Sequence, residues 1–296
     1  MTSYTLIVNA RSNSLRAEKI IRASESLIHQ TLANCEIIYV SEPDELIALS
    51  SKTAKNSTVV IACGGDGTAQ SVARGIYGSK ALMGLIPIGS GNDFAKAIGL
   101  KTRQSVEYYL NVIIQQQVIQ VDMPVINNQV FINTAGIGFD GLTNYYASQF
   151  SSLKGMMKYT VAGLKAFFTA QSFQIEGVID AQKWNERVWL IAVANGAIEG
   201  GKYLISPKSV NSDGILDLVI VPAYSRLKLG IAFILLSLGK SLPSSFSEVV
   251  AFEKASLNIQ EKHFIHLDGE VGNSSSKYKI EFKNKSLPVI GINPVL

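Results

Sequence analysis

The sequence predicts an α/β nucleotide-binding domain followed by a mostly β domain, and three observations support this. In the first third of the chain, apolar runs such as TVVIACGGDGT lead through polar loops into helical patterns. Such runs are typical of strands buried on both faces, and their alternation with helices indicates a parallel sheet. Beyond Asp122–Pro124 strand-like segments predominate, and 278–283 alternates between apolar and polar residues, as a half-exposed antiparallel strand does.

The elements of the first domain follow from these patterns. Strands are expected in TLIVN, TVVIAC and ALMGLIPI, each before a loop and a helix. The helices are expected at Leu15–Ile21, Ala69–Ile76 and Asp93–Ile98; in the second, apolar residues recur at i, i+3, i+4 and i+7.

The second domain is expected to be a β-sandwich. Its predicted strands are RVWLIAVA, GILDLVIVP, ASLNIQ, HFIHLDGE and SKYKIEFKN. The apolar run Leu229–Leu238 is too short to span a bilayer and predicts a buried helix. The domains are placed at 1–123 and 124–296, and the sequence leaves open whether the apolar tail at about 286–296 packs back onto the first domain.

Composition excludes several classes of protein. The 296 residues are 47% hydrophobic and 17% charged, which indicates a globular chain. A net charge of +4 is too small to indicate a nucleic-acid partner but is compatible with an anionic ligand or surface. Cys35 and Cys63 lack metal-ligand spacing, and no signal peptide or membrane span is predicted. These features favour the reducing cytoplasm.

The turn GGDGT, residues 64–68, joins a predicted strand to a predicted helix. Backbone N–H groups approach an anion closely where side chains are absent, and the helix N-terminus favours negative charge. Thr68 can cap the helix or bond a phosphate oxygen. Asp66 repels phosphate, so its presence there makes sense with a divalent cation between them. The alternative is a structural Asp that holds its own turn.

A second loop repeats this logic. In IPIGSGNDFAKAIG, Gly89, Ser90, Gly91 and Asn92 precede a helix whose first turn contains Asp93. One nucleotide could bridge two such loops at adjacent strand ends.

Two weaker signals point elsewhere. A formal G-x-G-x-x-G runs from Gly136 to Gly141, but the acidic residue that a dinucleotide site needs about 20 positions later is missing. The histidines, His29, His263 and His266, show no metal-ligand spacing and are expected to be exposed or simply packed.

Together the motifs resemble the diacylglycerol kinase catalytic-domain family, specifically the bacterial lipid kinases related to diacylglycerol and phosphatidylglycerol kinases. GGDGT matches the family signature, and IPIGSGNDFA matches its second motif with Ser90 where Thr is usual. FINTAGIGFDG, the stretch NG…GGKYLISPKSVNSDGILDLVIV and LDGE match later motifs in the family's order. GGDGT alone also fits NAD kinases and phosphofructokinases, but the whole set does not.

The resemblance implies an ATP-dependent lipid kinase that uses Mg²⁺ and acts in phospholipid metabolism. The implied nucleotide-binding residues are Asn9, Ser12, Gly64, Gly65, Asp66, Gly67, Thr68, Gly89, Ser90, Gly91, Asn92 and Asp93. The family usually opens with Asn-Pro-x-Ser-Gly, whereas this chain has Asn9-Ala10-Arg11-Ser12-Asn13. This departure puts the geometry of that loop, and with it the ATP affinity, in doubt.

The same resemblance assigns the chemistry to the second domain. Asp268 is the implied base for the lipid hydroxyl, and Glu270 is expected to bind Mg²⁺ or to orient Asp268. If LDGE is a strand, residues i and i+2 put both carboxylates on one face; without the family, Asp268–Glu270 is expected to be a turn.

Further metal ligands are implied at the nucleotide and in a structural site. Asp66 and Asp122 are the other implied ligands of the catalytic metal, with Asp93 in support. In NSDGILD, Asp213 and the carbonyls of Val210 and Ile215 are implied to hold a second Mg²⁺. An ordinary Asp-Gly turn is the alternative.

Residues 141–175 contain no Asp or Glu but include Lys154, Lys158 and Lys165. Apolar residues recur at helical spacing within 154–168, so this segment is expected to touch an anionic membrane peripherally. The alternative is a core helix with solvated lysines.

The sequence leaves other functions and the assembly open. A catalytically weak lipid-binding or regulatory protein could retain the same fold, and a soluble-metabolite kinase of the NAD type would act without lipid. The lipid acceptor and the oligomeric state are not specified, although a homodimer is compatible.

Overall fold

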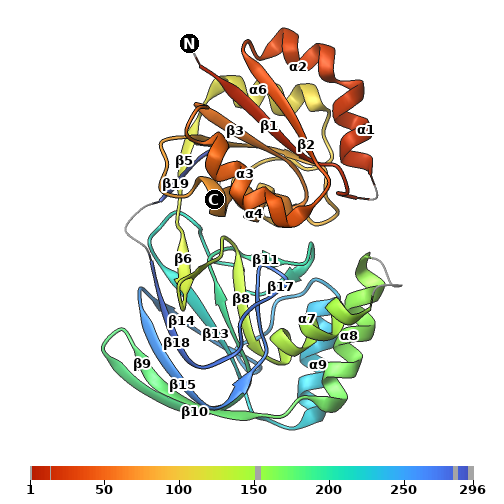
Figure 1. The fold of residues 1–296 in the computed structure, drawn as a ribbon. Helices are drawn as coiled ribbons and strands as arrows, with labels where there is room; N and C mark the ends of the chain where they lie inside the picture. Colours follow the sequence, from red (N-terminus) through yellow and green to blue (C-terminus); the bar gives the residue numbers. More distant parts are fainter. Residues whose placement is uncertain (1, 14, 151–154, 283–285, 293–296) are drawn as a thin grey trace. The chain divides into compact units, whose positions relative to one another are not determined.

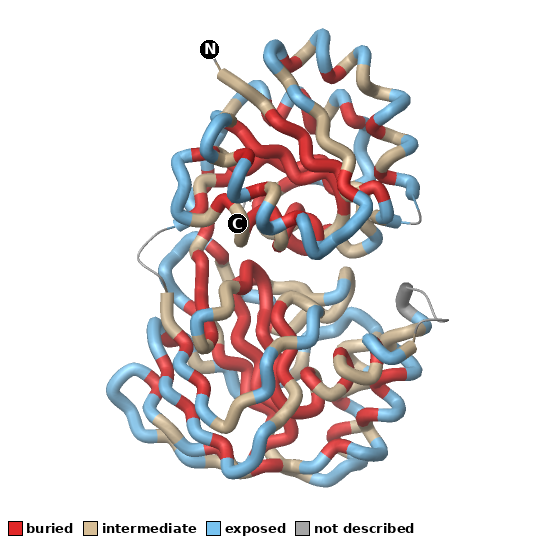
Figure 2. The backbone as a smooth tube through the Cα atoms, viewed as in Figure 1, coloured by how far each residue is buried: buried red, intermediate tan, exposed pale blue. Residues whose placement is uncertain are grey.

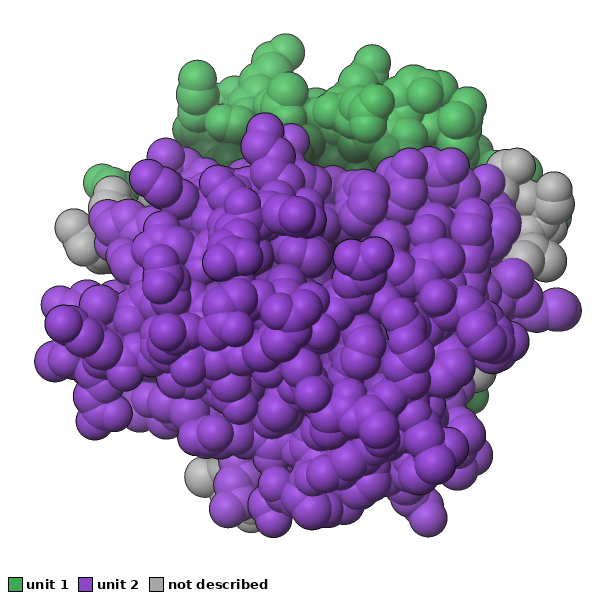
Figure 3. Space-filling model, turned by 90° about the horizontal axis from the view of Figure 1, so that it is seen from below, with its two compact units in different colours: residues 1–123, 284–296 green, residues 124–283 purple. Residues whose placement is uncertain are grey.

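The structure is a computed structural model that describes residues 2–13, 15–150, 155–282 and 286–292. The chain divides into two compact units, Met1–Met123 with Asn284–Leu296 and Pro124–Lys283; Figure 3 distinguishes them by colour. In each unit the buried residues follow the central strands (Figure 2).

The first unit contains a six-stranded, mostly parallel sheet (Figure 1). Its strand order is β2-β1-β3-β4-β19-β5, and β5 runs antiparallel to β19. The strands are β1 (Tyr4–Asn9), β2 (Cys35–Val40), β3 (Val59–Gly64), β4 (Leu82–Pro87), β5 (Val118–Val121) and β19 (Leu287–Ile290). The C-terminal strand β19 thus lies between two strands of the N-terminal unit.

Helices connect these strands as the α/β pattern requires. They are α1 (Arg16–Ala23), α2 (Glu25–Thr31), α3 (Leu46–Thr53), α4 (Asp66–Ile76), α5 (Asp93–Ala97) and α6 (Val106–Gln115), with a 3₁₀ turn η1 (Pro43–Glu45). Because β3 and β4 are parallel neighbours, their following loops emerge at one edge of the sheet. The predicted α/β class is confirmed.

The second unit is built on an antiparallel sheet, also as predicted. The main strand order is β17-β16-β8-β10-β9-β15-β18-β6-β7; β13 pairs with β10 and β14. The strands are β6 (Pro124–Ile126), β7 (Gln129–Val130), β8 (Thr134–Gly138), β9 (Phe173–Ile179), β10 (Gln182–Ala194), β13 (Leu216–Pro222), β14 (Glu248–Phe252), β15 (Ala255–His263), β16 (Ile265–Leu267), β17 (Glu270–Val271) and β18 (Ser275–Phe282). A separate hairpin pairs β11 (Ile198–Glu199) with β12 (Tyr203–Leu204).

Three helices accompany this sheet, α7 (Phe139–Gln149), α8 (Gly155–Thr169) and α9 (Arg226–Ser237). The expectation that the run from Leu229 to Leu238 forms a buried helix is wrong in its burial. Leu229 is buried, but Ile231 and Ile234 on the same helix are 42% and 57% exposed. Because almost every residue of this run is apolar, its sequence does not show which face of the helix packs against the sheet.

Candidate active site

Three loops of the first unit converge at Gly65. A Cβ on Gly89 would lie 2.5 Å from the Cα of Gly65, so the two glycine loops are in backbone contact. A Cβ on Gly65 would lie 3.9 Å from the Oγ of Ser12, in the loop after β1. The structure therefore brings together the three loops that the sequence assigns to nucleotide binding.

Asp66 holds the second loop. Its Oδ2 accepts the N–H of Asn92 at 2.7 Å, and its Oδ1 accepts the N–H of Phe94 at 3.2 Å. Burial raises the pKa of Asp66, nearby Asp93 adds to the rise, and the backbone N–H donors oppose it. The Asp66 carboxylate thus caps the N-terminus of α5, next to Asp93 in the first turn of that helix.

Side-chain hydrogen bonds stabilise both glycine loops, those at 64–68 and 89–92. Asn92 accepts the N–H of Gly89 and donates to its carbonyl, both at 2.9 Å. Asn9 donates to the Oγ1 of Thr68 at 3.1 Å. Thr68 is buried and is held within the fold by this bond. Ser90 lies exposed in the second loop, and Gly67 lies exposed in the first turn of α4.

The altered first loop keeps the backbone geometry that a glycine would allow. Asn13, which stands where the family has Gly, adopts φ +51°. Asn tolerates this left-handed region better than most residues, and its side chain donates to the carbonyl of Ile88 at 3.1 Å. Arg11 pairs with Glu42 at 3.0 Å.

In the second unit, Asp268 lies in a turn, so the strand assumed for LDGE is wrong. Asp268 and Gly269 join β16 to β17 with φ of +52° and +84°. Two consecutive positive φ values are typical of a type I′ hairpin turn, which favours Asp-Gly. The turn expected without the family is the one present, and Glu270 begins β17 as an exposed residue.

Backbone amides surround the Asp268 carboxylate. Its Oδ1 accepts the N–H of Asn133 at 2.7 Å and of Thr134 at 3.0 Å, and its Oδ2 accepts the N–H of Ile132 at 2.9 Å. The N–H of Asp268 donates to the carbonyl of Thr134 at 2.7 Å. Three N–H donors fix the orientation of the carboxylate.

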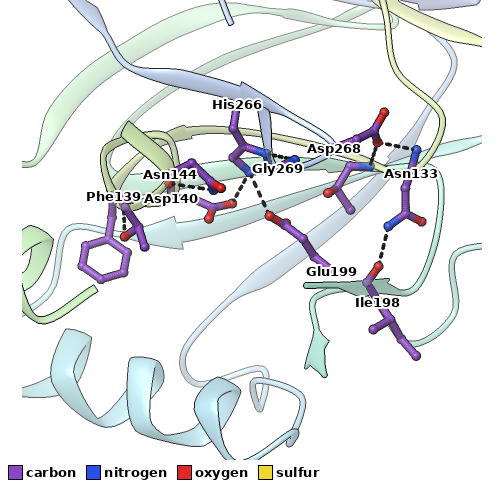
Figure 4. A network of polar contacts seen from close by, with 11 residues as sticks. Asn133, Phe139, Asp140, Asn144, Ile198, Glu199, His266, Asp268 and Gly269 are labelled. Carbon is purple, nitrogen blue, oxygen red and sulfur yellow. Dashed lines mark hydrogen bonds and ion pairs between the residues drawn. The ribbon is translucent and has the colours of Figure 1, made fainter. Parts of the chain in front are cut away.

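Next to this turn lies a buried cluster that the sequence interpretation missed (Figure 4). The Nε2 of His266 is 2.8 Å from Oδ2 of Asp140 and 3.3 Å from Oε1 of Glu199. His266 has no exposed surface. The available signals were Asp140 within the motif at 131–141 and His266 two residues before Asp268, but spacing alone did not connect them.

The cluster retains protons at neutral pH. Burial lowers the pKa of His266, but Glu199 and Asp140 outweigh it and raise that pKa. Burial, reinforced by Asp140, raises the pKa of Glu199 to about 8 although His266 opposes it. A shared proton thus relieves the repulsion between the two carboxylates, and it lies on their side of the ring because the N–H of Gly269 opposes a proton on Nδ1.

Stability should therefore fall as pH rises from about 4.5 to about 8. Both pKa values exceed their ordinary values of 4.5 and 6.5, so in this range the folded protein holds protons that the unfolded chain releases. Each such proton costs roughly 1 kcal/mol of unfolding free energy per pH unit. Denaturant unfolding across this range should show the decline. Glu199→Gln should flatten it, whereas the exposed Glu248→Gln should not; an unchanged slope in Glu199→Gln would contradict the assignment.

The glycines of the G-x-G-x-x-G segment have packing roles. A Cβ on Gly136 would lie 2.2 Å from Oδ2 of Asp140 and 2.4 Å from Nε2 of His266. Gly138 has φ +89°, and a Cβ on Gly141 would lie 2.0 Å from the carbonyl oxygen of Phe264. These contacts account for the pattern without a dinucleotide.

The remaining predicted residues are more dispersed. Asp122 lies between β5 and β6 and is half-buried. Oδ1 of Asp213 accepts the N–H of Ile215 at 3.0 Å, so the Asp-Gly turn is present, with Val210 three residues earlier.

Asp93 is buried and pairs with Lys96 at 3.0 Å. His29 is exposed, and His263 packs against the Phe173 ring in a tilted orientation with 4.1 Å between centroids.

Comparisons with known proteins identify both parts of the chain. Residues 3–126 match the diacylglycerol kinase catalytic domain, and residues 133–290 match the YegS C-terminal NAD kinase beta sandwich-like domain. A diacylglycerol kinase of Bacillus subtilis is 26% identical over 232 residues, 77% of this chain and 76% of that protein. A probable YegS-like lipid kinase of Pseudomonas putida is 32% identical over 168 residues, 55% of this chain and 56% of that protein. The crystal structure of a diacylglycerol kinase from Bacillus anthracis, 20% identical, shares the fold with a TM-score of 0.77 over 99% of this chain and 98% of that one.

Proposed function

The chain combines a diacylglycerol kinase catalytic domain with a YegS-like C-terminal domain and so belongs to the family of diacylglycerol kinases and YegS-like lipid kinases. We propose that it is an ATP-dependent lipid kinase. It transfers the γ-phosphate to the free hydroxyl of diacylglycerol or a related lipid. The observation that carries the proposal is the convergence of the three predicted nucleotide loops at Gly65. The name of the Bacillus subtilis relative favours the same acceptor class.

The first unit binds the nucleotide in this proposal. The bare backbone at Gly65 and at Gly67, in the first turn of α4, lets N–H groups reach phosphate oxygens, and the N-terminus of α4 favours their charge. Asp66 and Asn92 keep the two loops in register through the bonds described above. The nucleotide thus meets a preformed cradle.

Asp268 is the proposed base. The lipid hydroxyl gives its proton to a carboxylate oxygen of Asp268 while the hydroxyl oxygen forms a bond to the γ-phosphorus. The bond from that phosphorus to the bridging oxygen of ATP breaks, and ADP leaves. The amides of 132–134 fix the position of the carboxylate that takes this proton.

The donor set fits Mg²⁺, which prefers oxygen ligands and would neutralise the phosphate charge. Backbone N–H groups of residues 92–94 fix the orientation of the Asp66 carboxylate at the two loops, and its oxygens are the ligand type that Mg²⁺ takes. Glu270 and Asp122 are the other proposed ligands, with Asp93 in support. A second, structural Mg²⁺ is proposed at Asp213 and the carbonyls of Val210 and Ile215.

Phosphate transfer from labelled ATP in mixed micelles tests the proposal over a panel of hydroxyl lipids and soluble acceptors that include NAD. We expect label in a diacylglycerol-like lipid. Folded protein that binds ATP but labels no lipid would favour the regulatory alternative. Label in NAD alone would favour the soluble-metabolite kinase.

A lipid acceptor requires contact with a membrane, and we propose that α8 and α9 make it. The apolar residues predicted on the first helix are exposed rather than part of the core, and α9 shows a second row at identical spacing. The rows are Met157, Val161, Leu164 and Phe168, and Leu227, Ile231, Ile234 and Leu238, with exposures of 38–77%. In the described parts of the chain, every helix is too short or too polar to cross a bilayer.

The two helices pack against each other in the same unit. A Cβ on Gly163 of α8 would lie 2.4 Å from the Phe233 ring of α9. Arg226 donates to the carbonyls of Phe167 and Ala170. This packing fixes both apolar rows on one pair of helices.

The charge around these helices suits an anionic lipid surface. Neither 141–175 nor 218–247 contains Asp or Glu, whereas Lys158, Lys165, Arg226, Lys228 and Lys240 lie within them. Each such cation adds about 1 kcal/mol near an anionic membrane. Lys154, also predicted to contribute, lies outside the described residues.

The double variant Met157→Glu/Leu227→Glu should bind anionic vesicles at least about 10-fold more weakly. Each change removes an apolar side chain worth about 1.5–3 kcal/mol when buried and adds charge repulsion. Vesicle flotation with phosphatidylglycerol measures the effect. Ile114→Glu, a 47% exposed helical position in the first unit, is the matched control. Equal losses in both variants would contradict this surface.

A further inference from the structure

His266 lies between two elements with different functions. On one side its Nδ1 accepts the N–H of Gly269 at 3.2 Å, and Gly269 directly follows the proposed base. On the other side its Nε2 faces Asp140 on α7 and Glu199 on β11. Both ring nitrogens of a completely buried imidazole are thus engaged (Figure 4).

These contacts define the tautomer of the ring. A nitrogen that accepts the N–H of Gly269 must present its lone pair, so the proton of a neutral ring is on Nε2. Two carboxylates at 2.8 and 3.3 Å are the acceptors for that Nε2–H. A metal ion on Nε2 would need the opposite tautomer, and its Nδ1–H would then oppose the N–H of Gly269. The arrangement therefore favours a hydrogen-bonding role over a metal centre.

The surrounding residues leave space for this arrangement and connect it by hydrogen bonds to the residues that hold Asp268. The absence of a side chain at Gly136 leaves room for the His266–Asp140 pair. Asn133 donates from its backbone N–H to Asp268 and from its side chain to the carbonyl of Ile198, the residue before Glu199. The amides that hold Asp268 and the acid that faces His266 are therefore parts of one closed network.

We propose that His266 is a positioning residue, kept as the Nε2–H tautomer by Asp140 and Glu199, which fixes the Asp268–Gly269 turn for proton transfer. Without the bond from Gly269, the turn can shift away from the 132–134 amides. A misplacement of about 1 Å can cost about 10²-fold in rate. This inference rests on the proposed function, because the role of the turn is expressed in turnover.

Two variants separate the two nitrogens. His266→Asn keeps an acceptor at the position of Nδ1 and removes the Nε2–H, whereas His266→Gln keeps a donor at the position of Nε2 and removes the acceptor. We expect His266→Gln to lower kcat about 10- to 100-fold with KM for ATP unchanged. His266→Asn should keep kcat within about threefold, even though its buried carboxylates lose a partner and its melting temperature falls. His263→Gln, a half-buried histidine outside the cluster, should behave as the wild-type protein.

Losses of kcat that follow the melting temperature in both variants would overturn the proposal, as would a normal kcat in His266→Gln. Ring ¹⁵N spectra of the wild-type protein provide a readout that does not depend on activity. A protonated Nε2 and an unprotonated Nδ1 on His266 are expected at neutral pH, and the opposite tautomer would refute the proposal. If the wild-type protein phosphorylates no lipid, the kinase assignment fails while these spectra still decide the role of His266 at the turn.

Discussion

Asp268→Asn should lower kcat for lipid phosphorylation by about 10²–10⁴-fold while leaving ATP affinity unchanged. An amide cannot accept the proton of the lipid hydroxyl, and general-base catalysis is typically worth that much. The proposed nucleotide loops belong to the other unit, so their contacts stay intact. Turnover from labelled ATP and equilibrium binding of ATP measure the two quantities separately.

The structure also defines the control for this variant. An Asn at 268 can present its one oxygen to the N–H groups of Asn133 and Thr134, but its NH₂ then faces the N–H of Ile132. A local loss of order must therefore be distinguished from a loss of chemistry. Asp180 has φ +50°, and its carboxylate accepts the N–H groups of Glu253 and Lys254. Asp180→Asn should show a similar change in stability with normal turnover; unchanged kcat in Asp268→Asn would remove this residue from the mechanism.

The sequence was sufficient to predict the strands and loops that local patterns of residues determine. Apolar runs followed by glycine loops identify parallel strands because the strands are buried on both faces, as β3 is along its whole length. The loops after β3 and β4 could be paired in advance because parallel neighbours end at one edge. The convergence of Ser12, Gly65 and Gly89 follows from that topology.

Contacts between residues far apart in the sequence could not be predicted from it. Asp140 and His266 are separated by 126 positions and meet only because β16 pairs with β8. Helix α9 is apolar on more than one face, so its sequence cannot show that Ile234 and Leu238 are exposed. LDGE is compatible with both a strand and a turn, and the hairpin is determined by its neighbours.

Gly65→Val should weaken ATP binding at least about 10- to 100-fold, the loss expected from one or two hydrogen bonds to charged phosphate. Its Cβ would lie 3.2 Å from the Cα of Gly89, and the γ-methyl groups extend further into the same contact. The substitution therefore covers the bare backbone and separates the two loops.

A surface glycine of the same unit provides the control for Gly65→Val. Gly78 has φ +79°, and a Cβ on it would have no neighbouring atom within 4 Å; Asn tolerates that φ. Gly78→Asn should bind ATP normally. Isothermal titration with ATP and Mg²⁺ compares the variants, and a thermal melt establishes that Gly65→Val is folded. Normal ATP affinity in folded Gly65→Val would show that these loops do not form the phosphate cradle, and the nucleotide would then have to be sought elsewhere in the chain.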